Sequence, residues 1–480
     1  MPKYLIVGGV AGGASAAARL RRLDESAQII LIERGDYISY ANCGLPYYAG
    51  GTIKERSRLF VMTPEKFRES LEVEVRTGTE ALAIDRERKR LSLLERATGR
   101  RYEESYDALI LSPGAEPLRP PLPGIDDERV FCLRSVPDID RIKEYLDARR
   151  PERAVIVGAG FIGLEMAENL AGRGVSVTIV EALDQVMGPL DFEMAALVHE
   201  HLKAKGVELY LGEAVASFAP QGPRLGVCLK SGEVLPADLV LLSIGVRPES
   251  GLAREAGLSV DERGAIAVDA SMRTADPSIY ALGDAAAVAN LVTGKRGSVP
   301  LAGPANKEAR VVADAIAGRP GAAYRGAVGA SVAKVFDLTV AAVGLNEKVA
   351  RREGREVSSV IVHPSSHAGY YPGAKPLSLK ILFSPEDGRL LGAQAVGWEG
   401  VEKRVDVLSA FIQMGGSVSD LARFEQCYAP PFSSAKDPVN YAGFVAENLL
   451  SGLTRLKCWS EVEGLREGGA LLLDVRTREE

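Results

Sequence analysis

The sequence predicts an α/β protein with two parallel-sheet domains and a smaller α+β domain toward the C-terminus. Residues 4–33 and 154–181 each read as an apolar strand, a glycine-rich turn, a helix and a second strand that ends in a glutamate. This order is typical of a βαβ unit in a doubly wound sheet. Beyond residue 330, short apolar strands and one amphipathic helix follow, which favours an antiparallel sheet.

The composition excludes several classes of protein. The chain has 480 residues and a net charge of −6 without a large basic block, so we expect several domains and no nucleic-acid partner. No apolar run has the length of a membrane span, and residues 4–7 are too short for a signal peptide. The cysteines form no C-x-x-C pair, which favours a reducing, cytoplasmic location; they are Cys43, Cys132, Cys228, Cys427 and Cys458.

The first βαβ unit has the features of a Rossmann-like dinucleotide-binding motif. Tyr4–Val7 is an apolar strand, a helix is expected over residues 14–23, and the next strand ends at Glu33, 25 residues after Gly8. The helix N-terminus would bind a pyrophosphate and the carboxylate a ribose. Val10 replaces the second glycine of G-x-G-x-x-G. The candidate contacts are Gly8, Gly9, Val10, Ala11, Gly12, Gly13, Glu33 and Arg34.

The second unit matches G-x-G-x-x-G in full. A strand over residues 154–157 enters the turn, a helix follows over residues 164–173, and the strand at residues 175–180 ends at Glu181. A glutamate there favours the free ribose of NADH, and no arginine follows at residues 182–185 to bind the 2′-phosphate of NADPH, the alternative. The candidate contacts are Gly158, Gly160, Ile162, Gly163 and Glu181.

Two such units predict two dinucleotides, for which a flavin and a nicotinamide are the natural pairing. Residues 106–115 and 239–245 read as closing strands that end in small residues, and residues 278–284 as a strand ending in Gly-Asp. Asp284 could bind a ribityl hydroxyl or cap a helix. We also predict antiparallel strands at residues 71–75 and 91–94, a linker at 117–124, and a charged helix at 191–205 whose His199 and His201 form no metal site.

Cys43 lies in the segment Ser39-Tyr40-Ala41-Asn42-Cys43-Gly44. A helix beginning just past Asn42 would favour the thiolate at its N-terminus. The alternative is a small residue packed under a loop. Arg19 and Arg22 share one face of the first helix, which fits either a phosphorylated substrate or a solvated charged surface.

Taken together, these motifs resemble the two-dinucleotide flavoprotein disulfide reductases over residues 1–445. The single-cysteine segment is similar to that of coenzyme A-disulfide reductases and NADH-dependent persulfide or polysulfide reductases. The resemblance implies that Cys43 is the redox cysteine. It implies coenzyme A contacts at Ser15, Arg19, Arg22, Ser39 and Asn42, and FAD contacts that include Ser112, Pro113, Gly114, Gly245, Gly283, Asp284 and Ala302.

The resemblance also implies a domain order and a homodimer. Residues 1–115 and 245–325 would bind FAD, residues 116–244 would bind NAD(P)H, and residues 326–445 would form the dimer interface. Strands are expected at residues 334–345, 357–363, 377–383 and 390–396, and a helix at 401–413. Tyr370 and Tyr428 would face Cys43 across the dimer, with Lys436 as a further substrate contact, although both tyrosines could simply be packing residues.

Residues 446–480 resemble the opening of a rhodanese domain, with a helix at 459–465 and a buried strand at 470–476. The sequence ends before a rhodanese cysteine, so rhodanese chemistry is not predicted. About 35 residues cannot build that core.

The sequence therefore predicts an FAD- and NADH-dependent reductase of coenzyme A disulfide, coenzyme A persulfide or polysulfide. In this reading, Cys43 attacks the S–S bond and Tyr370 or Tyr428 protonates the leaving sulfur. The first alternative is an NADH oxidase or peroxidase that cycles Cys43 through sulfenic acid; those relatives carry a histidine at the position of Ala11. Two others are a flavin-binding redox or sulfur-carrying protein without turnover, and electron transfer to a ferredoxin.

Overall fold

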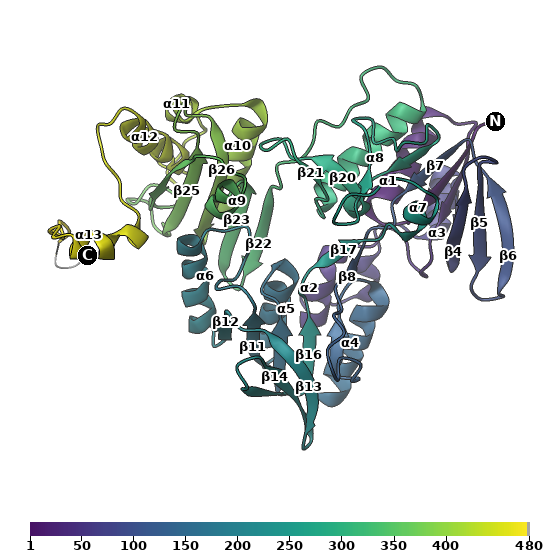
Figure 1. The fold of residues 1–480 in the computed structure, drawn as a ribbon, viewed down its shortest axis with the longest axis horizontal. Coiled ribbons are helices and arrows are strands. Elements are labelled where there is room, and N and C mark those ends of the chain that lie inside the picture. The colour runs from purple at the N-terminus through teal and green to yellow at the C-terminus, as the bar shows by residue number, and fades with distance from the viewer. Residues whose placement is uncertain (478–480) are drawn as a thin grey trace.

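The computed structural model describes residues 1–477. Figure 1 shows three domains, with the C-terminal segment beyond the third. The first domain contains a parallel sheet in the order β19 (Ile279–Ala281), β7 (Ala108–Leu111), β1 (Lys3–Val7), β2 (Gln28–Ile32) and β3 (Glu74–Arg76). Helices α1 (Ala11–Leu23) and α8 (Ala302–Ile316) pack against each other beside it.

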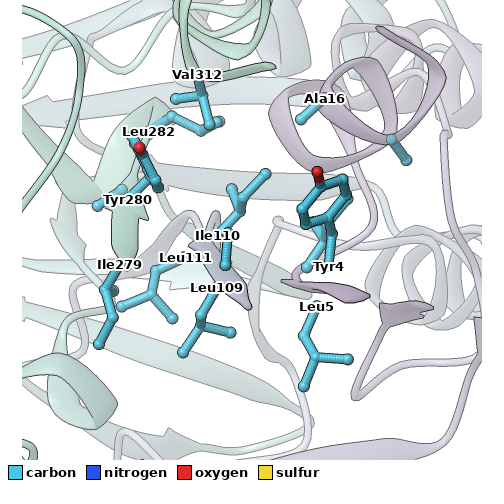
Figure 2. Packing of buried hydrophobic residues seen from close by; sticks show 14 of the residues in the cluster. Tyr4, Leu5, Ala16, Leu109, Ile110, Leu111, Ile279, Tyr280, Leu282 and Val312 are labelled. Carbon is cyan, nitrogen blue, oxygen red and sulfur yellow. The ribbon is translucent and has the colours of Figure 1, made fainter. Parts of the chain in front are cut away.

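The core of this domain explains why its strands read as continuous apolar runs. Leu109, Ile110 and Leu111 of β7 are all buried. Figure 2 shows these side chains between the neighbouring strands, with Ala16 and Val312 on the helices. A central parallel strand is covered on both faces, so it needs apolar residues at every position. The predicted strands at residues 4–7, 29–32 and 106–115 are confirmed in this sheet.

One predicted strand is wrong. Residues 71–75 were expected to be antiparallel, but Pro64–Leu71 forms helix α3, and β3 pairs parallel with β2. The reason is local: the Thr63 hydroxyl accepts the N–H of Lys66, and Pro64 stands in the first turn of the helix. The antiparallel sheet instead contains β4 (Thr79–Asp85), β5 (Arg90–Glu95) and β6 (Arg100–Ser105), which confirms the strand at residues 91–94.

The second domain repeats the parallel design. Its sheet has the order β12 (Glu208–Leu211), β11 (Ser176–Glu181), β10 (Arg153–Val157), β16 (Leu239–Leu242) and β9 (Val130–Cys132). A separate antiparallel sheet holds three further strands. These strands are β13 (Val215–Gln221), β14 (Arg224–Leu229) and β15 (Val234–Ala237). The helices of the second domain are α4 (Val136–Arg149), α5 (Phe161–Ala171) and α6 (Phe192–Ala204).

The third domain is α+β, as predicted. An antiparallel sheet has the order β22 (Ser331–Val335), β23 (Leu338–Gly344), β26 (Leu390–Gly397), β25 (Leu377–Phe383) and β24 (Ser358–Val362). Helices α10 (Val401–Met414) and α12 (Pro438–Leu450) contact it. Residues 334–345 are not one strand, because the chain reverses at Phe336 (φ 57°) and Val335 pairs with Leu338. An apolar aromatic at a hairpin turn hid this reversal from the sequence pattern.

The structure also contains shorter elements. They are η1 (Asn42–Gly44), α2 (Leu45–Gly50), η2 (Arg56–Leu59), β8 (Ala115–Pro117), β17 (Val246–Pro248), α7 (Gly251–Glu255), β18 (Ile266–Ala267), η3 (Gly283–Ala285), β20 (Ala286–Ala289), β21 (Arg296–Gly297), α9 (Glu347–Arg352) and α11 (Val418–Arg423).

The C-terminal segment is only partly as expected. The predicted helix is confirmed as η4 (Trp459–Glu461) and α13 (Val462–Glu467), and the Trp459 ring lies 5.7 Å from that of Phe192 in α6. The buried strand at residues 470–476 is wrong, since Leu471 is 88% exposed and has no strand partner. A strand needs a neighbouring strand to satisfy its backbone. Among the helices of residues 1–477, none has the length and apolar character needed to cross a bilayer.

A buried lysine joins the second and third domains. Lys380 on β25 is fully buried, and its ammonium contacts Asp191 at 2.9 Å, Glu347 at 2.7 Å, and Glu193. Three carboxylates this close could hold a metal ion, but here they hold the ammonium group. Their attraction outweighs the loss of solvent and raises the pKa of Lys380.

Replacing Lys380 by Met should destabilise the protein, because the partly buried carboxylates would lose their counter-ion. We expect the free energy of unfolding to fall by about 3–5 kcal/mol, measured by urea denaturation. Lys334→Met is the matched control: Lys334 also pairs with a carboxylate, Glu168, but its side chain is 55% exposed, so the loss should stay below about 1 kcal/mol. Equal losses in the two variants would contradict this account.

Candidate active site at Cys43

A large cavity opens where the three domains meet. Its volume is about 2360 Å³, and residues from both glycine turns, from η1 and from the third domain line it. Cys43 is the one cysteine on its wall among the described residues. The cavity is therefore the place where bound dinucleotides and a reactive thiol could meet.

The first glycine turn, at the end of β1, is shaped by a close backbone contact. Gly8 has φ 97°, and a Cβ on it would lie 2.0 Å from the carbonyl oxygen of Ser112. The Glu33 carboxylate accepts the N–H of Gly9 at 2.9 Å and that of Gly35 at 2.7 Å. Helix α1 begins at Ala11 with its N-terminus at the cavity. Such an N-terminus beside a ribose-binding acid suits a dinucleotide.

The second turn has the same geometry. Gly158 has φ 103°, and a Cβ on it would lie 2.5 Å from the Ser243 carbonyl oxygen. The Glu181 carboxylate accepts the N–H of Ala159 at 2.7 Å and that of Leu183 at 2.9 Å. A Cβ on Gly160 would meet no protein atom within 4 Å, so this side of the turn is open to a ligand. Both helices begin three residues earlier than predicted, directly at the turns.

The predicted dinucleotide residues fall into two groups. Those on the cavity wall are Gly8, Val10, Ala11, Gly12, Glu33, Arg34, Ser112, Pro113, Gly114, Gly158, Gly160, Ile162, Glu181, Gly245, Gly283, Asp284 and Ala302. The other three lie behind the turns and hold their shape: Gly9 against Ile38, Gly13 against Gly8, and Gly163 against Gly158.

Asp284 lies in η3 at the end of β19, close to where α8 begins at Ala302. Within residues 1–477 its side chain accepts no hydrogen bond, and it lines the cavity. Burial raises the pKa of this carboxyl. The Asp284 carboxyl is therefore free to accept hydrogen bonds from the hydroxyl groups of a flavin bound in the cavity.

Glu308 on α8 escaped the sequence analysis. It is buried and accepts the N–H of Gly283 at 2.7 Å, so it fixes the turn that presents Asp284. Burial raises the pKa of Glu308 to about 7. The signal was available, because residue 308 falls on the helix face occupied by Ala305, Ala309 and Val312.

Arg34 and Arg134 share one carboxylate on the cavity wall. Glu249 pairs with Arg34 at 2.8 Å and with Arg134 at 2.9 Å. Arg134 also donates to the carbonyl of Pro113 at 3.1 Å. This network, of which the sequence indicated only Arg34, ties the strand ends of the first two domains to each other.

Cys43 lies in η1 and is exposed at the cavity wall. We expected the protein to lower the pKa of Cys43, and this prediction is wrong, because the surrounding polypeptide raises it. Loss of solvent and then the nearby Glu165 carboxylate raise the pKa of the Cys43 thiol, and these outweigh the backbone N–H that favours the thiolate. The helix expected after Asn42 is present, but it is a single 3₁₀ turn followed by the six-residue α2.

Glu165 and Tyr47 form a second pair that sequence reasoning missed. The Tyr47 hydroxyl donates to Glu165 Oε1 at 3.4 Å. Burial raises the pKa of Glu165, and burial together with that carboxylate raises the pKa of Tyr47 to about 12. Glu165 lies in the second turn of α5, two residues after Gly163, and lines the same cavity as Cys43.

The predicted substrate contacts are only partly brought together. Asn42 lies beside Cys43 on the cavity wall. Ser15 donates to Asn306 of α8, and Arg19 pairs with Asp314 at 2.7 Å, so both side chains are used in the contact between α1 and α8 and neither lines the cavity. Arg22 is exposed further along α1. Ser39 uses its backbone, since its N–H donates to the Gly9 carbonyl at 2.8 Å.

The two predicted tyrosines meet each other but not Cys43 of the same chain. Their hydroxyl oxygens are 2.5 Å apart, and this bond raises the pKa of Tyr370. Tyr370 is 75% and Tyr428 47% exposed, and neither lines the cavity. Lys436 is exposed in the same region.

Arg404 holds the two tyrosine-bearing segments together. This buried residue of α10 donates to Asp437 at 2.8 Å and to the carbonyl of Ser366 at 2.9 Å. Ser366 precedes Tyr370, and Asp437 follows Tyr428 and caps α12. One clue was present in the sequence, namely an arginine on the helix face of Val401, Val405 and Leu408.

Replacing Glu165 by Gln should lower the pKa of Cys43, because it removes the negative charge that disfavours the thiolate. The pH profile of Cys43 alkylation would then shift, so that the rate begins to rise at a lower pH than in the parent protein. Mass spectrometry of the peptide that contains Cys43 measures this rate separately from the exposed Cys427 and Cys458. Glu168→Gln, one helical turn away, should move the profile much less. An unchanged profile for Glu165→Gln would contradict the assigned cause.

Comparisons with known proteins place this geometry in a family. Residues 2–309 match the pyridine nucleotide-disulphide oxidoreductase family, and residues 330–438 match its dimerisation domain. The chain is 36% identical over 447 residues to the coenzyme A disulfide reductase of Staphylococcus aureus, covering 93% of this chain and 100% of the relative.

Two solved structures are also similar. The reduced CoADR-RHD of Bacillus anthracis has 49% identity and a TM-score of 0.97, covering 100% of this chain and 86% of that one. The NAD-dependent persulfide reductase of A. fulgidus has 40% identity and a TM-score of 0.91, covering 94% and 84%. These findings confirm the predicted fold class, the resemblance and the pairing of FAD with NAD(P)H. The chain belongs to the pyridine nucleotide-disulphide oxidoreductase family and is a flavin-dependent member of it.

Proposed function

We propose that this protein reduces the S–S bond of a coenzyme A derivative with NADH, and that Cys43 is the attacking thiol. The observation that carries the proposal is the position of Cys43 as the one cysteine, among the described residues, on a cavity into which both dinucleotide turns open. The names of the similar proteins support two substrates, coenzyme A disulfide and a persulfide. Polysulfide shares the same sulfur chemistry.

In the proposed reaction, Cys43, the flavin and a tyrosine have separate roles. The Cys43 thiolate attacks one sulfur of the substrate, and the other sulfur leaves as a thiolate or as sulfide. FAD, when bound, supplies the path by which two electrons from NADH reach the resulting sulfur–sulfur bond. A tyrosine hydroxyl gives a proton to the departing sulfur. The balance is two electrons and two protons for each S–S bond reduced.

The active site in this proposal is shared across a homodimer. Both tyrosines belong to the segment that matches the dimerisation domain, and their hydroxyl pair is exposed rather than aimed at Cys43 of the same chain. A dimer that brings the pair to the other chain's cavity would supply the missing proton donor. Lys436 lies in the same segment and would contact the substrate from there.

Domain limits and location are part of this proposal. We assign residues 1–115 and 245–325 to FAD, 116–244 to NAD(P)H and 326–445 to the dimer interface, and we assign 446–480 to a C-terminal segment that resembles the start of a rhodanese domain. All five cysteines are free, which suits a reducing cytoplasm.

Replacing Cys43 by Ser should abolish turnover while flavin remains bound. We expect anaerobic NADH oxidation with coenzyme A disulfide or persulfide to fall by about a thousandfold or more. Flavin absorbance checks the cofactor, and Cys427→Ser, also exposed, is the control that should keep full activity. Full turnover in Cys43→Ser would refute the mechanism. NADH oxidation that needs only oxygen or peroxide would favour the oxidase, and bound flavin without any turnover would favour a binding protein.

Replacing Glu181 by Ala should weaken the preference for NADH. The carboxylate would otherwise bind the ribose hydroxyls of NADH and repel the phosphate of NADPH. We expect the ratio of kcat/KM for NADH over NADPH to fall about tenfold to a hundredfold in steady-state assays. Glu33→Ala is the matched control in the first turn, and it should reduce flavin retention and leave the nucleotide ratio unchanged. The same ratio in Glu181→Ala and the parent would contradict the assignment.

A further inference from the structure

The segment that carries Cys43 pairs with a second stretch of the first domain. The Ala41 N–H donates to the Leu59 carbonyl at 2.7 Å, and Tyr40 forms an antiparallel bridge with Phe60. These contacts involve the residues just before η1, in which Cys43 lies. A shift of the second stretch would therefore move the cysteine as well.

This second stretch is joined to the second domain by an arginine. Arg56, the first residue of η2, donates from Nε to Asp140 Oδ1 at 2.9 Å and from Nη2 to Asp140 Oδ2 at 2.7 Å. Asp140 lies on α4. A bidentate pair fixes the orientation of the two groups as well as their separation, so η2 is attached to α4 in one geometry.

Two aromatic rings pack against the same guanidinium group. Its central carbon lies 4.9 Å from the centre of the Tyr37 ring and 5.3 Å from that of the Phe60 ring. The Arg56 Nη2 also donates to the Tyr37 hydroxyl at 2.9 Å. Tyr37 lines the cavity, whereas Arg56 does not. A flat guanidinium group can pack on aromatic rings and bind a carboxylate at once, and Arg56 thus joins the cavity wall, Phe60 and α4.

Overall stability does not account well for this arrangement. Ion pairs that are partly exposed contribute little to the free energy of unfolding. Other contacts already join the first two domains, because Glu249 pairs with both Arg34 and Arg134, and α2 packs against α5. The distinct consequence of the Arg56 contacts is local, since they fix the stretch that pairs with the Cys43 segment.

We propose that Arg56 is a positioning residue for Cys43, and that it acts by attaching η2 and Phe60 to Asp140 of the second domain. The inference rests on the proposed function, in which Cys43 attacks the S–S bond. Arg56 itself touches neither substrate nor cofactor in this arrangement. Because a displacement of about 1 Å can slow a reaction a hundredfold, loss of the attachment would slow the step at Cys43 and leave the two glycine turns unchanged.

The test measures the two halves of the reaction separately in the variant Arg56→Gln. Anaerobic stopped-flow absorbance would follow the reduction of the bound flavin by NADH, and then its reoxidation by coenzyme A disulfide or coenzyme A persulfide. We expect the rate of flavin reduction to stay unchanged and the rate of reoxidation to fall about tenfold to a hundredfold. An equal loss in both halves would indicate a general structural effect and overturn the inference.

Two further variants control for the substitution itself. Asp140→Asn removes the other half of the pair and should slow reoxidation alone, and the double variant should be no slower than either single variant. Additive losses in the double variant would contradict the coupling. Arg86→Gln is the matched control, because Arg86 pairs with Asp276 at 2.9 Å and its side chain is 35% exposed, against 36% for Arg56. It should change neither rate.

Alkylation of Cys43 in the flavin-loaded protein gives a readout that does not depend on turnover. A less firmly held segment would expose the sulfur to more solvent, which would lower the pKa of the thiol toward its usual value. The alkylation rate at neutral pH, measured by mass spectrometry of the Cys43 peptide, should rise about threefold to tenfold in Arg56→Gln and in Asp140→Asn. It should not rise in Arg86→Gln, and equal rates in all the variants would overturn the positioning role.

The outcomes separate the two proposals. Parent protein that reduces neither coenzyme A disulfide nor coenzyme A persulfide refutes the proposed function, and the alkylation rates then still show whether Arg56 holds Cys43. Parent protein whose turnover depends on Cys43, together with an unchanged reoxidation rate in Arg56→Gln, refutes the positioning role alone.

Discussion

The structure depends on one steric constraint, which it uses twice. At Gly8 and at Gly158, the backbone passes so close to the end of a neighbouring strand that the carbonyl oxygens of Ser112 and Ser243 occupy the space of a side chain. Because the backbone comes so close at both glycines, the chain can turn there directly from a strand into a helix whose N-terminus faces the cavity. In each case a glutamate from the next strand fastens the turn by accepting one of its N–H groups.

The two turns open into the same cavity, and Cys43 lies on its wall. The polypeptide around Cys43 does not favour its thiolate. Although the residue is exposed at the cavity wall, the surrounding protein removes part of the solvent from the sulfur, and this loss and the Glu165 carboxylate both raise the pKa of the thiol. The charge must then be stabilised by what binds in the cavity or by the substrate itself. A thiol that becomes reactive only in the assembled complex would be protected from reaction elsewhere.

Local sequence could predict the parts of the fold whose cause is local. The strand, turn, helix and acid of each unit lie within 30 residues, so their pattern predicts the turns, Glu33, Glu181 and the neighbourhood of Cys43. The hairpin at Phe336 and the helix at Pro64–Leu71 depended on turn and cap chemistry that the apolar pattern concealed. The apolar run at residues 470–476 was misread because a strand exists only beside another strand.

The residues that were missed are mostly buried charges with distant partners. Lys380 meets acids 187 and 189 positions before it in the sequence, and Glu308 meets a backbone N–H 25 positions away. In the sequence, each of them is visible only as a charged residue at a position where an apolar residue is expected. The residue with which it pairs cannot be identified from the sequence. A charged residue at such a position has a structural consequence. A buried ion pair is stable only in a narrow range of geometries, whereas apolar side chains can pack in several relative positions.

These buried charges fix orientation where the proposed chemistry needs it. Lys380 sets the third domain against the second, and Arg404 holds Tyr370 and Tyr428 in one unit. The tyrosine pair thus has a defined position relative to the second domain of its own chain. A dimer contact that places the pair over another chain's Cys43 would therefore also fix how that chain's cavity stands relative to its neighbour. Geometry of this precision allows a proton donor on one subunit to serve a thiol on the other.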